Sequence, residues 1–329
     1  MNIIKKTFSY FGAIIFLIIL FFSLVYLASI SLKFINEDYY SQLRDKIRVF
    51  RTENFRESQK YRFKELHPYF ENYDVKSIIR VKDNKNAIIA RKKILKIIWN
   101  NPEERNSIFP NKIIKTDLSN SKNYNFNKIK NLLHSLKEVK ELRYISPRGF
   151  VSKSMHFIPK SSNSSLVIFH GGNTGSFFKH IKTINFFLNE GFEVIAYSMW
   201  IIDEQPEITI NSIGAIKFRD HSFLKFLDEP LRVYFDPLIA GINYLTSKKH
   251  YNNIIAVGFS GGGWVVTVLS AFDQRVNLSY PIAGTYPIYL RRFRNWSTWQ
   301  ESYPPLLDAA NYLDLYIMSA QGIGRRQVQ

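Results

Sequence analysis

Hydrophobic and polar residues follow three different patterns along this chain of 329 residues. The first 32 residues are dominated by one long apolar run, and residues 33–136 are polar with apolar positions at helical spacing in places. From residue 137 onward, short apolar runs alternate with longer amphipathic stretches. We therefore expect three parts: an N-terminal segment 1–32, a mainly helical region 33–136 and a folded domain 137–329.

The N-terminal run is long enough to cross a membrane. No residue from Thr7 to Leu32 is charged, and Gly12–Ile30 is almost continuously apolar. A helix of roughly 20 such residues spans a bilayer core of about 30 Å. The run predicts a single-pass transmembrane anchor, with a cleaved signal peptide as the competing interpretation. Basic residues lie on both sides of the run, so the side of the membrane that holds the large domain stays undecided.

The middle region carries most of the positive charge. Residues 33–150 account for +13 of the net charge of +18. Acidic and basic side chains alternate there without forming a known nucleic-acid module, so we interpret them as solvated helix faces and expect no nucleic-acid partner. Ile88–Asn101 has the clearest helical period, and this helix either packs on the domain or lies on a membrane surface.

The third part predicts an α/β fold with a doubly wound, mostly parallel sheet, because strand-like and helix-like stretches alternate along it. An antiparallel pair of strands enters the sheet, and Gly191 ends the first helix after the Gly-rich turn. The strands expected are Val139–Tyr144, Val151–Ile158, Leu166–His170, Phe192–Met199, Ile254–Phe259, Leu278–Gly284 and Leu313–Ala320. An irregular excursion, Ile201–Pro230, is either a cap over a pocket or a plain surface insertion.

The composition limits the kinds of active site that this chain can hold. Apolar residues make up 46% of the chain and aromatic residues 16%, which is typical of a globular protein and excludes a disordered chain. The chain has no cysteine, which excludes disulfides, thiolate zinc sites and a thiol nucleophile. The sequence also lacks a metal-ligand cluster and a nucleotide fingerprint, so we expect no metal and no cofactor.

Two Gly-rich turns carry the candidate chemistry. Gly258-Phe259-Ser260-Gly261-Gly262 fits the pattern G-x-S-x-G between an apolar strand and a helix, where a nucleophile in a strained turn needs neighbours without a Cβ. His170-Gly171-Gly172-Asn173 follows an earlier strand, where backbone N–H groups can hold an oxyanion. A Gly-rich turn of this kind can also bind a phosphate or simply pack tightly.

With these two motifs, the region 137–329 resembles the esterase- and lipase-like members of the α/β-hydrolase superfamily. The resemblance implies that Ser260 is a nucleophile and that Gly261 with Gly172 or Asn173 forms the oxyanion hole. It also implies hydrolysis of an ester or related acyl bond, with a small acyl compound as substrate. A lipid-like substrate is one option, given the membrane anchor that we expect.

The sequence departs from the family pattern after the nucleophile. The family order is Ser, acid, His, but all seven histidines precede Ser260. Three explanations stay open: the chain is truncated before its acid and His, His221 acts as base from an unusual position, or the domain is an inactive, membrane-tethered binding module.

Three other histidines and two late aspartates are assigned no part in catalysis. We interpret His170 as a structural part of its loop, His180 as a packed or solvated helix residue and His250 as a surface residue. Asp308 and Asp314 precede or begin the last expected strand, at the wrong end for catalysis.

Overall fold

The computed structural model describes residues 74–116, 134–172, 176–199, 207–210, 214–217, 221–287 and 298–329, together with Ser23. The chain divides into two units, Met1–Tyr73 and Asp74–Gln329, and the account below concerns the second. The anchor predicted within residues 1–32 lies outside the described residues. Among the helices that are described, none combines the length and apolar character needed to cross a bilayer.

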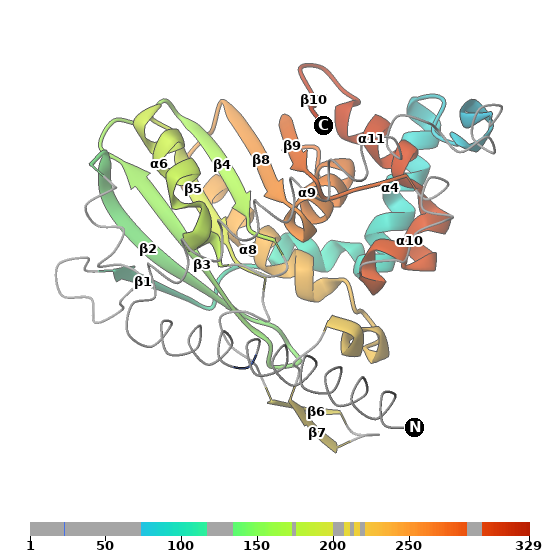
Figure 1. The fold of residues 1–329 in the computed structure, drawn as a ribbon, viewed down its shortest axis with the longest axis horizontal. Helices are drawn as coiled ribbons and strands as arrows, with labels where there is room; N and C mark the ends of the chain where they lie inside the picture. Colours follow the sequence, from blue (N-terminus) through green and yellow to red (C-terminus); the bar gives the residue numbers. More distant parts are fainter. Residues whose placement is uncertain are drawn as a thin grey trace, which may run out of the picture. The chain divides into compact units, whose positions relative to one another are not determined.

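An eight-stranded sheet organises the second unit (Figure 1). The strand order is β1-β2-β3-β5-β4-β8-β9-β10, antiparallel from β1 to β5 and parallel from β5 to β10. The strands are β1 (Lys112–Thr116), β2 (Leu136–Ile145), β3 (Val151–Pro159), β4 (Ser165–His170), β5 (Glu193–Tyr197), β8 (Asn253–Phe259), β9 (Leu278–Ile282) and β10 (Arg326–Gln327). A separate hairpin pairs β6 (Glu207–Ile210) with β7 (Gly214–Lys217) inside the excursion.

Helices cover both faces of the sheet, as a doubly wound fold requires. The α-helices are α4 (Asn84–Ile98), α6 (Ile181–Asn189), α8 (Arg232–Lys248), α9 (Gly261–Phe272), α10 (Pro304–Ala309) and α11 (Tyr312–Ala320). Short 3-10 helices are η1 (Val75–Ile78), η2 (Pro102–Ser107), η3 (Phe177–His180), η4 (His221–Phe226) and η6 (Trp299–Ser302).

Alternation along the central strands divides the apolar core into two clusters. In β4, Leu166 and Ile168 join the cluster with α4, α8, α9, α10 and α11, whereas Val167 and Phe169 join the cluster with η3 and α6. Successive strand residues point to opposite faces, so a strand that is buried on both faces is apolar throughout. This explains why the short apolar runs of the sequence predicted central parallel strands correctly.

The boundary expected between residues 136 and 137 does not separate two units, since Asp74–Gln329 forms one. Strand β1 extends the sheet, and α4 packs in the main core through Ala87, Ile94 and Ile98. Packing on the domain is therefore the fate of the Ile88–Asn101 helix, while Ile88 and Ile89 remain on its exposed side.

The last expected strand is wrong: Leu313–Ala320 lies in helix α11. Asn311 caps this helix, accepting bonds from the backbone of Leu313 and Asp314, while the Asp314 carboxylate accepts from the Asn311 backbone. This capping box starts a helix, and Leu315 and Met318 then enter the core beside α9. The chain adds only the two-residue strand β10, parallel to β9.

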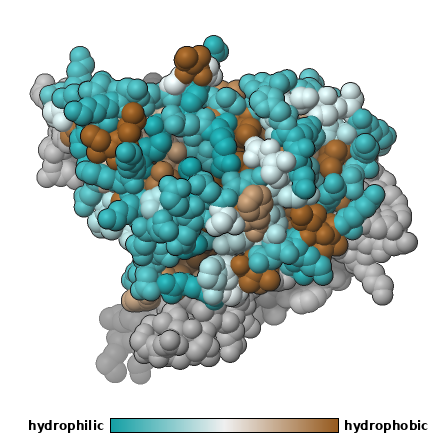
Figure 2. All heavy atoms as spheres, turned by 180° about the vertical axis from the view of Figure 1, so that it is seen from behind, coloured by the Kyte–Doolittle hydropathy of each residue, from teal (hydrophilic) through white to brown (hydrophobic). Residues whose placement is uncertain are grey.

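The face of the molecule opposite to that in Figure 1 is mainly hydrophilic (Figure 2). Its hydrophobic side chains lie in small, separate groups between hydrophilic ones. Scattered apolar side chains of this kind are normal on a soluble surface and do not by themselves mark an interface.

Candidate active site

Ser260 lies at a sharp turn between β8 and α9. Its backbone has φ +54° and ψ −122°, a conformation that residues other than glycine rarely adopt. The Ser260 N–H donates to Ile282 O of β9 at 2.8 Å, and its carbonyl accepts from Trp264 N at 3.2 Å. The predicted strand–turn–helix context of G-x-S-x-G is thus confirmed, and bonds from the neighbouring strand and the following helix hold the strained turn.

Two glycines of this motif have no room for a side chain. A Cβ on Gly258 would lie 2.1 Å from Gly262 O, inside the turn itself. A Cβ on Gly262 would lie 2.3 Å from His170 O and 2.5 Å from Gly171 O. Gly258 therefore permits the turn, and Gly262 permits contact between the turn and the Gly-rich loop after β4.

The loop after β4 lies directly against Ser260. A Cβ on Gly172 would lie 3.0 Å from Phe259 O and 3.1 Å from Ser260 Cβ. Gly171 N–H donates to Tyr197 O at 2.9 Å, so this residue shapes the loop. Gly261 opens α9, where the first N–H groups of a helix have no acceptor within the helix. The structure brings the two predicted motifs together, whereas Asn173 lies outside the described residues.

His170 is buried beside this loop. Its Nδ1 is 2.7 Å from Gly171 O, and its ring stacks on Tyr197 with centroids 6.2 Å apart. Burial lowers the pKa of His170 to about 4, so the ring is neutral at pH 7 and its Nδ1–H donates to the carbonyl. These contacts fit the structural role that we expected.

The other histidines of interest divide into packed and exposed residues. The His180 ring contacts those of Phe169 and Phe259, each at 5.4 Å, and burial lowers its pKa. His250 is exposed, as predicted. His221 opens η4, and its side chain is outside the description. Within the described part of the chain, no histidine is hydrogen-bonded to Ser260 Oγ.

Asp314 is a structural residue. It is fully buried, and Oδ1 accepts from the backbone N–H groups of Arg80 and Val81 at 2.7 and 2.9 Å. Its Oδ2 accepts from Arg80 Nε at 3.1 Å and Asn311 N at 3.0 Å. The three donors from Arg80 and Val81 join the segment after η1 to α11, and the fourth caps α11 itself, whereas Asp308 is exposed on α10.

Sequence reasoning missed the support that β9 gives to the turn. Ala283, just after β9, has φ +51°, and a Cβ on Gly263 would lie 2.8 Å from Gly284 Cα. Backbone therefore packs on backbone where α9 begins. Gly284, two residues after the apolar strand β9, is the signal in the sequence for this contact.

No protein-family model and no curated protein matches this sequence. Among solved structures, the chain is similar to a candidate acetyl xylan esterase from Bacteroides fragilis NCTC 9343, with TM-score 0.51 and 14% identity over 78% of this chain and 68% of that one. It is also similar to a methylesterase (TM-score 0.49, 15% identity, 75% of this chain and 51% of that one). This chain thus spans about half the length of the methylesterase. The acetyl xylan esterase 1 of Thermoanaerobacterium sp. JW/SL YS485 has TM-score 0.43 and 14% identity, over 75% of this chain and 80% of that one.

Proposed function

Because the chain has the α/β-hydrolase fold found in esterases, we propose that it is a serine hydrolase that cleaves an ester or related acyl bond, with Ser260 as nucleophile. The observation that carries the proposal is the strained backbone of Ser260 beside the loop that contains Gly172. A phosphate-binding turn does not need a serine in this strained conformation, but a nucleophile that must project from a strand end does.

In this mechanism, Ser260 Oγ attacks the carbonyl carbon of the substrate. The N–H groups of Gly261 and Gly172 donate to the oxygen that becomes negative, and the positive end of the α9 dipole adds to that field. The intermediate collapses to an acyl-enzyme and releases the alcohol, which takes the proton removed from Ser260. Water then attacks the acyl-enzyme by the reverse sequence and releases the acid.

The base that accepts the Ser260 proton is not among the described contacts, and His221, whose side chain lies outside the description, is our candidate for it. The alternative function, an inactive binding module, is favoured by the absence of a described histidine bonded to Ser260 Oγ. A serine without a base is a weak nucleophile, so the two functions differ in the reactivity of this one side chain.

Labelling with a fluorophosphonate probe tests the proposal. We expect the wild-type protein and the surface variant Ser161→Ala to be labelled and Ser260→Ala to remain unlabelled. The same three proteins should show the same pattern in hydrolysis of 4-nitrophenyl acetate. A wild-type protein that melts cooperatively but neither reacts with the probe nor hydrolyses the ester would support the binding module instead. If His221 is the base, His221→Gln abolishes labelling while the protein stays folded.

We also propose that the charge-free run within Thr7–Leu32 anchors the chain in a membrane. Extraction of the expressed full chain tests this second proposal. An anchored protein stays in the membrane fraction in alkaline carbonate and is released by detergent, whereas recovery in the carbonate supernatant would overturn it.

A further inference from the structure

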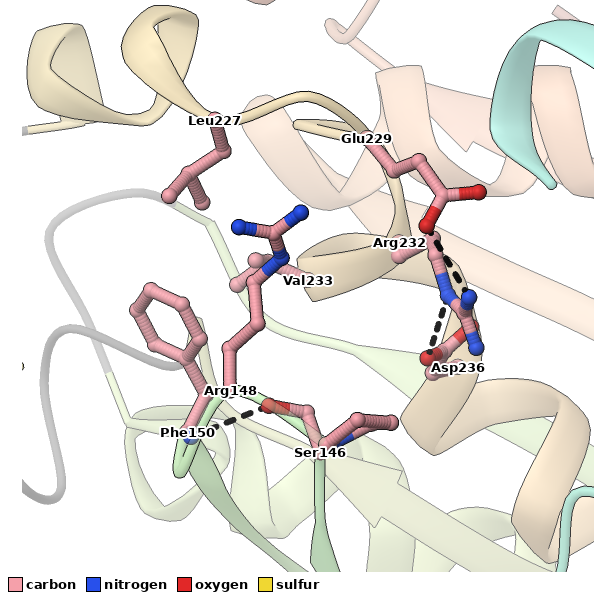
Figure 3. Close-up of a pocket in the computed structure, with 9 residues that line it drawn as sticks. Ser146, Arg148, Phe150, Leu227, Glu229, Arg232, Val233 and Asp236 are labelled. Carbon is pink, nitrogen blue, oxygen red and sulfur yellow. Dashed lines mark hydrogen bonds and ion pairs between the residues drawn. The ribbon is translucent and has the colours of Figure 1, made fainter. Parts of the chain in front are cut away.

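A cavity of about 280 Å³ opens between the turn that joins β2 to β3 and the start of α8 (Figure 3). One wall is formed by residues of that turn, including Arg148 and Phe150. The other is formed by Leu227, Glu229 and the first residues of α8. Neither Ser260 nor the Gly-rich loop lines this cavity, so it is separate from the candidate catalytic centre.

The cavity nevertheless lies at the same edge of the sheet as Ser260. Strand β3 begins next to the turn, and its Ser154 pairs with Tyr197, near the carboxyl end of β5. Tyr197 pairs with His170, and His170 pairs with Gly258, two residues before Ser260. Three strand spacings of about 4.8 Å separate β3 from β8, so the cavity lies at least about 14 Å from the nucleophile.

A fixed network of charges forms one side of the cavity. Arg232 donates to Glu229 at 3.1 Å, to Asp236 at 3.1 Å and to Glu104 at 3.0 Å. Asp236 is only 1% exposed and also accepts from Trp99 Nε1 at 2.7 Å and Tyr144 OH at 2.8 Å. Since each charge in this network has opposite-charge or hydrogen-bond partners, the network shapes the wall and has no need of a ligand.

Arg148 differs from Arg232 because its partner is exchangeable. Its guanidinium extends between the two walls in Figure 3, and its side chain is 42% exposed. Within the described residues, its ion pair is with Asp228, 2.8 Å away and 82% exposed. Exposed ion pairs of this kind contribute little to stability, so a ligand anion can replace Asp228.

Apolar side chains complete the lining. Phe150 and Leu227 flank Arg148, and Val233 lies behind it (Figure 3). Val233 also borders a separate gap of about 10 Å³ that is lined in part by His170 and Tyr197, so this one side chain contacts both spaces. The cavity therefore offers apolar side chains around Arg148, beside the paired charges of Arg232, at the same edge of the sheet as Ser260.

We propose that this cavity binds the far end of the substrate, and that the substrate is an ester with an extended apolar chain ending in an anionic group such as a carboxylate. The inference rests on the proposed esterase function. A chain that spans at least about 14 Å at about 1.2 Å per bond needs about twelve bonds or more. The apolar chain would contact Phe150 and Val233, and the anion would pair with Arg148 in place of Asp228.

Two matched substrates test the inference: the mono-4-nitrophenyl ester of dodecanedioic acid, which ends in a carboxylate, and 4-nitrophenyl dodecanoate, which ends in a methyl group. The measured quantity is the ratio of their kcat/KM values. We expect Arg148→Gln to lower this ratio about fivefold, the upper range for an exposed ion pair, and Asp228→Asn to raise it. Lys182→Gln, at an exposed position of α6, is the control and leaves the ratio unchanged. An unchanged ratio in Arg148→Gln overturns the inference.

Failure of the inference can be distinguished from failure of the esterase proposal. Hydrolysis of 4-nitrophenyl acetate that disappears in Ser260→Ala supports the catalytic proposal, whatever the ratio shows. If no ester is hydrolysed, calorimetric titration of dodecanedioate into Ser260→Ala decides the binding site by itself. Binding that weakens about fivefold when Arg148→Gln is added supports the cavity as an anion site, and equal affinity or no binding overturns it.

Discussion

Replacement of Gly262 by alanine tests the central geometric argument, that the turn at Ser260 and the loop after β4 must touch through backbone atoms. The new Cβ would lie 2.3 Å from His170 O and 2.5 Å from Gly171 O, where ordinary contact begins at 3.4 Å. The loop or the turn must therefore move by about 1 Å. A displacement of this size at a catalytic group costs about 100-fold in rate, equivalent to about 2.7 kcal/mol of transition-state stabilisation.

The assay is kcat/KM for 4-nitrophenyl acetate, with thermal melting of the same samples to establish that they are folded. Gly191→Ala is the matched control, because Gly191 has φ +80° at the end of α6, far from the turn, where alanine is also strained. We expect Gly191→Ala to melt at a lower temperature with wild-type kcat/KM. If Gly262→Ala folds and keeps kcat/KM within about twofold of wild type, the contact between loop and turn does not position the oxyanion donors, and the reasoning fails.

Two further predictions concern stability. Asp314→Ala removes the buried acceptor of four hydrogen bonds and should lower the free energy of unfolding by about 3–5 kcal/mol in chemical denaturation. The exposed control Asp308→Ala should change it by less than about 0.5 kcal/mol. Equal effects of the two substitutions would contradict the structural role of Asp314. Burial alone would raise the pKa of Glu193, but hydrogen bonds from His156, Lys249 and Tyr251 outweigh it and lower this pKa from 4.5 to about 2. The ionised Glu193 therefore stabilises the folded protein by about 3 kcal/mol. This contribution is complete above pH 4.5 and is lost as the pH falls toward 2. The free energy of unfolding of Glu193→Gln, measured by chemical denaturation between pH 6 and pH 2, should fall less steeply with pH than that of the wild-type protein. An equal dependence on pH in the two proteins would refute the assignment.

The central sheet was predictable because its signals are local. Leu166–His170 and Ile254–Phe259 are short apolar runs bounded by turn residues, and burial on both faces leaves such strands no other composition. The turn at Ser260 was predictable for the same kind of reason, since Gly258 and Gly262 are needed two positions before and after the nucleophile. Its positive φ confirms the strained turn that the motif predicts.

Leu313–Ala320 was misassigned because an apolar run of eight residues is compatible with a strand and with a buried helix. The choice depended on the capping box at Asn311 and Asp314 and on the surface of α9 that the helix covers. The partner of the helix before residue 137 was not predictable for a similar reason. The apolar face of α4 shows that the helix is buried, but not against what.

By itself, the sequence determined the α/β class, the order of the central strands along the chain and the two Gly-rich turns, because each depends on residues close together in the chain. Only the tertiary structure decided which turns meet, which charged groups are already paired and where a cavity forms. Arg148 and Arg232 are both arginines in polar surroundings, yet Arg232 is held by three carboxylates and Arg148 by one exposed carboxylate. Glu104 lies 128 positions from Arg232, and Asp228 lies 80 positions from Arg148, so the fold brings these partners together and local sequence carries no record of such contacts.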